Sequence, residues 1–150
     1  MGGMAELFRG EKTFAEFGRI RVVVKHLLPQ YNDEPELISR FRDEARLGLT
    51  LRHPNIARVY EFRELERHHF MVMEEIEGRS VKQLVLDCRR SGVRFSQDVA
   101  AYILACVAEA LTYISEARTP EAEPMNLIHR DISPSNVLVA RDGRAKLCLL

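Results

Sequence analysis

The segment HRDISPSN at residues 129–136 is the most informative part of this 150-residue chain. It places a carboxylate, Asp131, five residues before a carboxamide, Asn136, in a short loop between the apolar segments 126–128 and 137–139. Phosphate transfer needs such a pair, because one acidic oxygen accepts the proton of the attacking hydroxyl group and one amide oxygen helps to hold a magnesium ion. Asp and Asn also favour turns, so the spacing by itself is equally typical of a simple turn.

An apolar run upstream of this loop ends in a lysine. Residues 21–25 read Arg-Val-Val-Val-Lys, and such a β-branched run predicts a buried strand. From the end of this strand, Lys25 could present its cation to a phosphate group. The alternative is a strand whose lysine simply reaches solvent.

A helix that carries a glutamate is predicted over residues 34–51. Glu44 lies beside an apolar stripe of this helix, and a carboxylate that faces the core requires a cation partner, because an unpaired buried charge costs several kcal/mol. Lys25 is the natural partner, whereas Arg40 is the alternative if Glu44 lies on the solvated face. The stripe consists of Leu37, Phe41, Ala45 and Gly48.

The order of these segments resembles that of a protein Ser/Thr kinase of the eukaryotic-like type found in bacteria. HRDISPSN fits the kinase catalytic-loop pattern, and residues 2–8 resemble the second half of the glycine-rich loop. Residues 53–56 match the segment after the regulatory helix, and residues 70–78 are similar to the last small-lobe strand and the interlobe hinge. Small-molecule kinases are the nearest rival, but the His-Pro-Asn and Met-Glu-Glu sequences in these segments fit protein kinases better.

The resemblance implies an α+β, protein kinase-like bilobal fold, with a small β-rich lobe and only the first part of the helical large lobe. Residues 1–73 correspond to the small lobe without its first strand, and residues 74–78 to the hinge. Residues 79–150 correspond to a partial large lobe that ends before the activation segment.

The residues themselves predict the elements within these parts. Strands are expected near residues 4–10, 16–25, 56–63 and 68–74. His68 and His69 are expected at the tip of a hairpin. Ser80 opens a helix through a Ser-x-x-Gln capping box, and Ser96 caps a longer helix that ends near Ile114. Further short strands are expected at residues 126–128, 137–139 and 145–148.

The resemblance also implies roles for single residues. Asp131 would be the catalytic base, Lys25 and Glu44 the ion pair that orients the ATP phosphates, and Asn136 a magnesium ligand. ATP and magnesium are the implied cofactors, and a protein is the implied substrate or partner. The residues implied in binding the nucleotide are Gly2, Gly3, Val23, Lys25, Met73, Glu74, Ile76 and Leu138.

Several positions depart from the pattern of this family. Ala5 stands where the last glycine of the loop is usual, Val23 replaces a smaller alanine, and Ser133 stands where a lysine is commonest. In the family, a magnesium-binding aspartate lies thirteen residues after the loop asparagine, but that count from Asn136 reaches Leu149. An aliphatic side chain cannot ligate magnesium, a hard cation that needs oxygen ligands.

We therefore expect a kinase chain that is truncated at both ends and inactive by itself. The alternatives are a pseudokinase-like interaction module and a non-functional kinase remnant. Residues 99–108 are all apolar or aromatic, which is typical of a helix covered on all sides, and the missing sequence should supply part of that cover.

Composition sets further limits. The chain is 46% apolar, which indicates a globular protein, and its net charge of zero gives no hint of nucleic acid or an anionic membrane as partner. Three cysteines lie far apart, with Cys106 and Cys148 expected in the core of a reduced, cytoplasmic protein. The longest apolar run is too short to span a bilayer, and neither end resembles a signal peptide.

Overall fold

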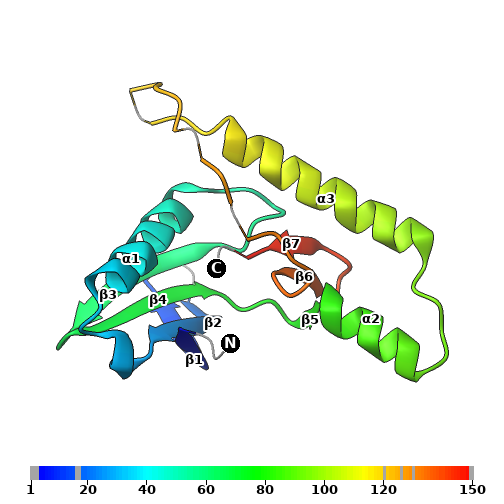
Figure 1. Cartoon of the computed structure of the whole chain (residues 1–150), viewed down its shortest axis with the longest axis horizontal. Helices are drawn as coiled ribbons and strands as arrows, with labels where there is room; N and C mark the ends of the chain where they lie inside the picture. The colour runs from blue at the N-terminus through cyan, green and yellow to red at the C-terminus, as the bar shows by residue number, and fades with distance from the viewer. Residues whose placement is uncertain (1–3, 16–17, 120, 126, 130, 149–150) are drawn as a thin grey trace. The chain divides into compact units, whose positions relative to one another are not determined.

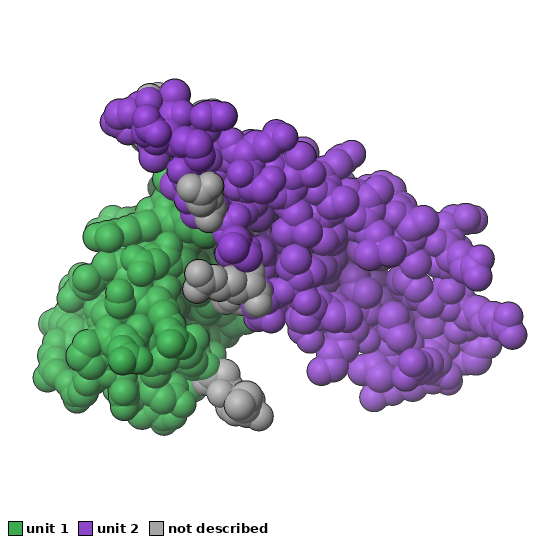
Figure 2. Space-filling model, turned by 45° about the horizontal axis from the view of Figure 1, so that its top comes forward, with its two compact units in different colours: residues 1–50, 58–75 green, residues 51–57, 76–150 purple. Residues whose placement is uncertain are grey.

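The computed structural model describes all residues except 1–3, 16–17, 120, 126, 130 and 149–150. The chain divides into two compact units (Figure 2). Unit 1 consists of residues 1–50 and 58–75, and unit 2 consists of residues 51–57 and 76–150. These units are defined by contacts within the chain, and the lobe and hinge boundaries drawn from the sequence stay a prediction.

Unit 1 is built on an antiparallel sheet with the strand order β1-β2-β4-β3 and one long helix, α1 (Figure 1). The strands and the helix predicted for this part of the chain are confirmed, although β1 extends beyond residue 10 and both β2 and β3 end two residues later than predicted. The first two residues of the strand predicted at 16–25 lie outside the described residues. The elements are β1 Ala5–Phe14, β2 Gly18–Leu27, the 3-10 helix η1 Pro29–Tyr31, α1 Pro35–Thr50, β3 Val59–Leu65 and β4 His68–Glu74.

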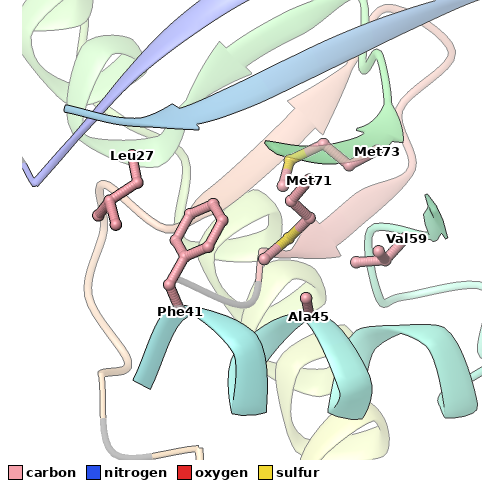
Figure 3. Close-up of a cluster of buried hydrophobic side chains, with 6 residues drawn as sticks. All are labelled: Leu27, Phe41, Ala45, Val59, Met71 and Met73. Carbon is pink, nitrogen blue, oxygen red and sulfur yellow. The ribbon is translucent and has the colours of Figure 1, made fainter. Parts of the chain in front are cut away.

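One face of this sheet packs against α1 through a cluster of buried apolar side chains (Figure 3). Phe41 and Ala45, from the predicted stripe of α1, point from the helix toward the strands. Phe41 is 1% exposed, so its burial contributes roughly 1.5–3 kcal/mol. This packing directs the neighbouring side chains of α1 toward the sheet. The cluster consists of Leu27, Phe41, Ala45, Val59, Met71 and Met73.

The hairpin between β3 and β4 turns at Glu66 and Arg67, whose φ angles are 48° and 69°. The prediction that His68 and His69 form its tip is wrong, because both residues belong to β4. Successive side chains of a strand point to opposite faces. His69 accordingly lies on the covered face with 3% exposure, and His68 points to the other face of the sheet.

Unit 2 contains a second antiparallel sheet with the order β5-β6-β7 and the helices α2 and α3 (Figure 1). Strand β5 was not predicted. Its Gly78 lies so close to β6 that a Cβ atom there would be 2.0 Å from the Val139 carbonyl oxygen. The elements are β5 Gly78–Ser80, α2 Val81–Arg90, α3 Gln97–Ser115, β6 Val137–Ala140 and β7 Ala145–Leu147.

The strand predicted at residues 126–128 is not observed in the part that the structure describes. Residues 127 and 128 belong to no strand, and residue 126 lies outside the described residues. Both edges of the neighbouring strand β6 are occupied by β5 and β7, so residues 127 and 128 cannot pair with β6. The predicted strands near 137–139 and 145–148 are confirmed.

The predicted capping box at the start of α2 is formed. The Ser80 hydroxyl accepts from the Gln83 N–H at 3.2 Å, and the Ser80 N–H donates to the Gln83 amide oxygen at 2.9 Å. Ser96 occupies the corresponding position of α3, but its side chain makes no capping hydrogen bond.

We expect Ser80→Ala to lower the free energy of unfolding by about 1 kcal/mol, because two terminal N–H groups lose or loosen their partners. Ser96→Ala is the matched control, with an expected loss of at most a few tenths of a kcal/mol. Urea denaturation followed by circular dichroism measures both values. Equal losses in the two variants would show that the capping box does not stabilise α2.

Helix α3 buries one side against the rest of unit 2 and exposes apolar residues on its other side. Ile103 and Ala110 are 5% and 0% exposed, whereas Tyr102 and Leu104 are 48% and 68% exposed. Cys106 and Cys148 are buried, as predicted. Among the described residues, α3 is long and apolar enough to cross a membrane by length and composition alone, a test that core helices of soluble proteins also pass.

Candidate functional site

The predicted ion pair between Lys25 and Glu44 is formed within unit 1. The Lys25 Nζ atom lies 2.8 Å from a Glu44 carboxylate oxygen, and the two side chains are only 8% and 15% exposed. Lys25 Nζ also lies 5.4 Å from the centre of the Phe41 ring, close enough for a cation–π contact. Strand β2 and helix α1 therefore hold a largely desolvated lysine on the covered face of the sheet.

Val23 and Met73, two residues expected to contact adenine, are cross-strand neighbours in this sheet. Val23 lies two residues before Lys25 in β2, so both side chains point to the same face. The register of β1 adds two residues to this face that the sequence analysis missed. Leu7 is paired with Lys25, and Arg9 is paired with Val23.

Arg9 forms an ion pair with Glu75, which directly follows β4. The Arg9 Nε atom lies 3.0 Å from a carboxylate oxygen of Glu75, whose side chain is 10% exposed. The preceding residue, Glu74, donates its backbone N–H to the Arg58 carbonyl oxygen at 2.8 Å. A backbone hydrogen bond between Glu74 and adenine would therefore have to use the carbonyl oxygen of Glu74 as the acceptor.

The loop of Asp131 and Asn136 belongs to unit 2, where one side chain orients the other. The Asn136 amide donates to the Asp131 carboxylate at 2.8 Å and to the Asp131 carbonyl oxygen at 3.0 Å. Asn136 is 6% exposed, whereas Asp131 is exposed. A buried amide thus holds an accessible carboxylate at the surface of the loop.

His129 fastens the start of this loop and was assigned no role from the sequence. Its Nδ1 atom accepts from the Asp131 N–H at 3.3 Å, and its Nε2 atom lies 3.1 Å from the Cys148 carbonyl oxygen, an acceptor. These two partners require a neutral imidazole that carries its proton on Nε2. Cys148 N–H in turn donates to the Asn136 carbonyl oxygen at 2.8 Å. His129 therefore positions Asp131 through the backbone.

The loop offers two kinds of oxygen that suit magnesium, the carboxylate of Asp131 and the amide oxygen of Asn136. Within the residues that the structure describes, no group of three or more His, Cys, Asp and Glu side chains could hold a metal ion. The loop alone offers two oxygen-bearing side chains, and magnesium commonly takes its remaining ligands from phosphates and water.

The other predicted site residues are distributed over the two units. Leu138 lies in β6 and, like Ile76, is half-buried within unit 2. Gly2, Gly3 and Leu149 lie outside the described residues.

The amino-acid sequence of the chain is similar to those of known proteins. The family described as "Protein kinase domain" matches residues 12–148. The chain is 33% identical to the tyrosine-protein kinase MasK of Myxococcus xanthus over 146 residues, which are 97% of this chain and 23% of that protein. It is 32% identical to the serine/threonine-protein kinase PknA of Mycobacterium tuberculosis over 151 aligned residues, or 97% and 32% of the two chains.

The chain also matches solved structures of kinase domains. A crystal structure of the Mycobacterium tuberculosis PknI kinase domain matches with a TM-score of 0.75 and 26% sequence identity. The match covers 99% of this chain and 55% of that one. The chain thus spans about a quarter to a third of the two curated relatives above and about half of the solved domain.

Proposed function

This chain belongs to the protein kinase domain family, and on that premise we propose that it takes part in the transfer of phosphate from ATP to hydroxyl groups of protein serine and threonine side chains. The predicted fold class, an α+β protein kinase-like fold with a β-rich small lobe, is confirmed by the match to solved kinase domains. Proteins of this family use ATP with a divalent metal ion and act on proteins. The names of several bacterial relatives support the choice of serine and threonine, whereas MasK is named a tyrosine-protein kinase.

The ion pair between Lys25 and Glu44 is the observation that carries the proposal. Stability alone is a poor explanation for it, because a buried ion pair is often no more stabilising than well-packed apolar residues. A desolvated lysine held by one carboxylate, on a sheet face lined by Val23 and Met73, suits the binding of a phosphate group instead. Kinases orient the phosphates of ATP with such a pair.

The loop residues supply complementary roles. Asp131 would accept the proton of the attacking hydroxyl group, since its carboxylate is exposed. Asn136 would hold that carboxylate through its NH₂ group, which leaves its amide oxygen available to a magnesium ion. The two roles of Asn136 use different atoms and are therefore compatible. Bound MgATP would supply the transferable phosphate and a cation that offsets the charge developing on it.

The nucleotide-binding residues are proposals of the same kind. Val23, Met73 and Leu138 would pack against the adenine ring, and the backbone of Glu74 and Ile76 would form hydrogen bonds to it. Gly2 and Gly3 would contribute backbone N–H groups to the phosphates. We propose the cytoplasm as the location, because the ATP that the proposed reaction needs is available there.

A thermal-shift assay on the 150-residue chain tests nucleotide binding. A ligand that binds only the folded state stabilises it by RT ln(1 + [L]/Kd), or about 1.4 kcal/mol at ten times Kd. MgATP at millimolar concentration is therefore expected to raise the melting temperature, whereas magnesium chloride alone is not. An unchanged melting temperature at saturating MgATP would contradict the proposed site.

A further inference from the structure

Two histidines of unit 1 contact each other on the face of the sheet opposite Lys25. His26, next to the end of β2, has its Nε2 atom 3.0 Å from the Nδ1 atom of His68, at the start of β4. The His26 ring stacks on Phe70, with ring centres 4.5 Å apart and an interplanar angle of 16°. The proposed function assigns no role to either histidine.

The proton in this contact can be placed from a third residue. A hydrogen bond between two imidazoles needs one nitrogen that carries a proton and one that does not. The amide Nδ2 atom of Asn32, which can only donate, lies 3.5 Å from the same His68 Nδ1. In this orientation of the amide, His68 Nδ1 is the acceptor and His26 Nε2 the donor. A proton added to His68 Nδ1 would remove both contacts at once.

The oxygen of the same amide is buried and has no hydrogen-bond partner among the residues that the structure describes. A buried polar atom without a partner is unfavourable. Because the two ends of an amide have nearly the same shape, a half turn of the Asn32 amide would exchange its Nδ2 and Oδ1 atoms. Oδ1 would then face His68 Nδ1 and could accept a hydrogen bond from a proton there, while the NH₂ group would take the buried position that Oδ1 leaves.

We propose that His68 is a proton-operated switch between two partners. Neutral His68 accepts a hydrogen bond from His26. Protonated His68 donates to Asn32 Oδ1 and releases His26. One proton taken up from solvent is the only chemical change, and the imidazole of histidine is the side chain that ordinarily changes charge between about pH 5 and 8.

The electrostatic surroundings disfavour a proton on His26. Burial lowers the pKa of His26, a charge on His68 lowers it further, and Glu6, its cross-strand neighbour on β1, opposes this effect. The nearby charged groups of other elements are Arg63, opposite Phe70 in β3, and Arg67 of the β3–β4 turn, which is ion-paired with Asp33.

The sign of the pH effect follows from the direction of the His26 shift. The pKa of His26 in the folded chain lies below its usual value of 6.5. Its contribution to stability is therefore fully present above that value and is lost as the pH falls through the folded-state pKa. Below pH 6.5 the unfolded chain takes up this proton more readily than the folded chain.

The position of the switch connects it to the ion pair of Lys25 and Glu44. Asn32 lies shortly before α1, which carries Glu44, and His26 directly follows Lys25 in β2. Proton uptake would therefore strengthen the link between β4 and the segment that leads into α1, and would free the side chain next to Lys25. Any effect on nucleotide binding rests on the function proposed above, whereas the switch itself does not.

NMR spectra of the imidazole nitrogens, recorded on the 150-residue chain between about pH 5 and 8, test the switch. His68 Nδ1 is expected to gain a proton first, and His26 Nε2 to change its hydrogen-bond partner at the same midpoint while His26 stays neutral. Asn32→Ala should move the His68 midpoint down by about half a pH unit or more, because the acceptor oxygen is lost. His53 and His129, in unit 2, are internal references.

Two results would overturn the switch. One is a His68 midpoint that Asn32→Ala leaves unchanged in a folded variant, as judged by unaltered His53 signals. The other is a hydrogen bond between His26 and His68 that survives protonation of His68. A parallel MgATP titration separates the two proposals. If the NMR changes occur but the chain does not bind MgATP, the proposed function alone is contradicted. If the chain binds MgATP but the NMR changes are absent, the switch alone is contradicted.

Discussion

Replacing Asp131 by Asn is expected to lower the rate of phosphate transfer by about 10²–10⁴-fold, because the change keeps the shape of the side chain but removes the acceptor of the hydroxyl proton. The test protein is a chimera in which residues 12–148 replace the matching stretch of the Mycobacterium tuberculosis PknI kinase domain. That domain supplies the remaining half of the fold. The measurement is the incorporation of radiolabelled phosphate from ATP into a protein substrate.

Ser135→Ala is the matched control in the chimera, since Ser135 is an exposed residue of the same loop. It should leave the rate within about twofold of the parent chimera, an effect well below 1 kcal/mol. Transfer at an undiminished rate by the Asp131→Asn chimera would remove Asp131 from the mechanism. A parent chimera that is folded and binds MgATP, yet transfers no phosphate, would contradict the proposed function as a whole.

The 150-residue chain by itself is expected to transfer phosphate at a negligible rate. A positioned base supplies only part of the acceleration, whereas the larger part comes from the metal ion and from charges around the phosphates. Position 149, where the family pattern has its aspartate, is a leucine here. Robust transfer by residues 1–150 that depends on Asp131 would show that this metal ligand is dispensable.

The ion pair of Lys25 and Glu44 could be predicted, because the sequence around each residue indicates where it lies. Lys25 ends a β-branched run, and Glu44 lies beside the apolar stripe that Phe41 and Ala45 belong to. A charge next to an apolar surface needs a partner of opposite charge, and this requirement leaves few candidate partners for Glu44. The 2.8 Å contact between the two residues is the result.

The contacts that the sequence could not provide depend on strand register. Arg9 meets Glu75, and His26 meets His68, only because of how β1, β2 and β4 are aligned. The β1–β2 connection contains no short turn signature that would fix this alignment. Periodicity shows which residues share a face of a strand, but it does not show which residue of the next strand lies opposite.

Two predictions for unit 2 failed for a related reason: a strand expected at residues 126–128 was not observed in the described part, and β5 was not predicted. Short strands are decided by their partners more than by their own residues. Residues 127 and 128 cannot pair with β6, because both of its edges are occupied. Gly78–Ser80 has no β-branched residue and pairs with β6 because glycine permits a close approach. Propensity favoured the first segment, and the available edges favoured the second.

Replacing Lys25 by Met is expected to weaken the binding of MgATP by about 10–100-fold, because a charge-assisted contact to phosphate is worth about 1.5–3 kcal/mol. The variant keeps the length of the side chain but leaves Glu44 without its cation, which by itself costs stability. Circular dichroism at the temperature of the titration must therefore show that the variant is folded. Lys12→Met, which removes a lysine from β1 outside this pair, is the control and should leave the affinity unchanged.

The dissociation constant of MgATP for the wild-type chain, Lys25→Met and Lys12→Met, measured by calorimetric titration, tests most directly whether Lys25 and Glu44 form a nucleotide site. We expect measurable binding by the wild-type chain and by Lys12→Met, and a loss of about tenfold or more in folded Lys25→Met. Equal affinities of the wild-type and Lys25→Met chains would contradict a nucleotide site at Lys25 and Glu44.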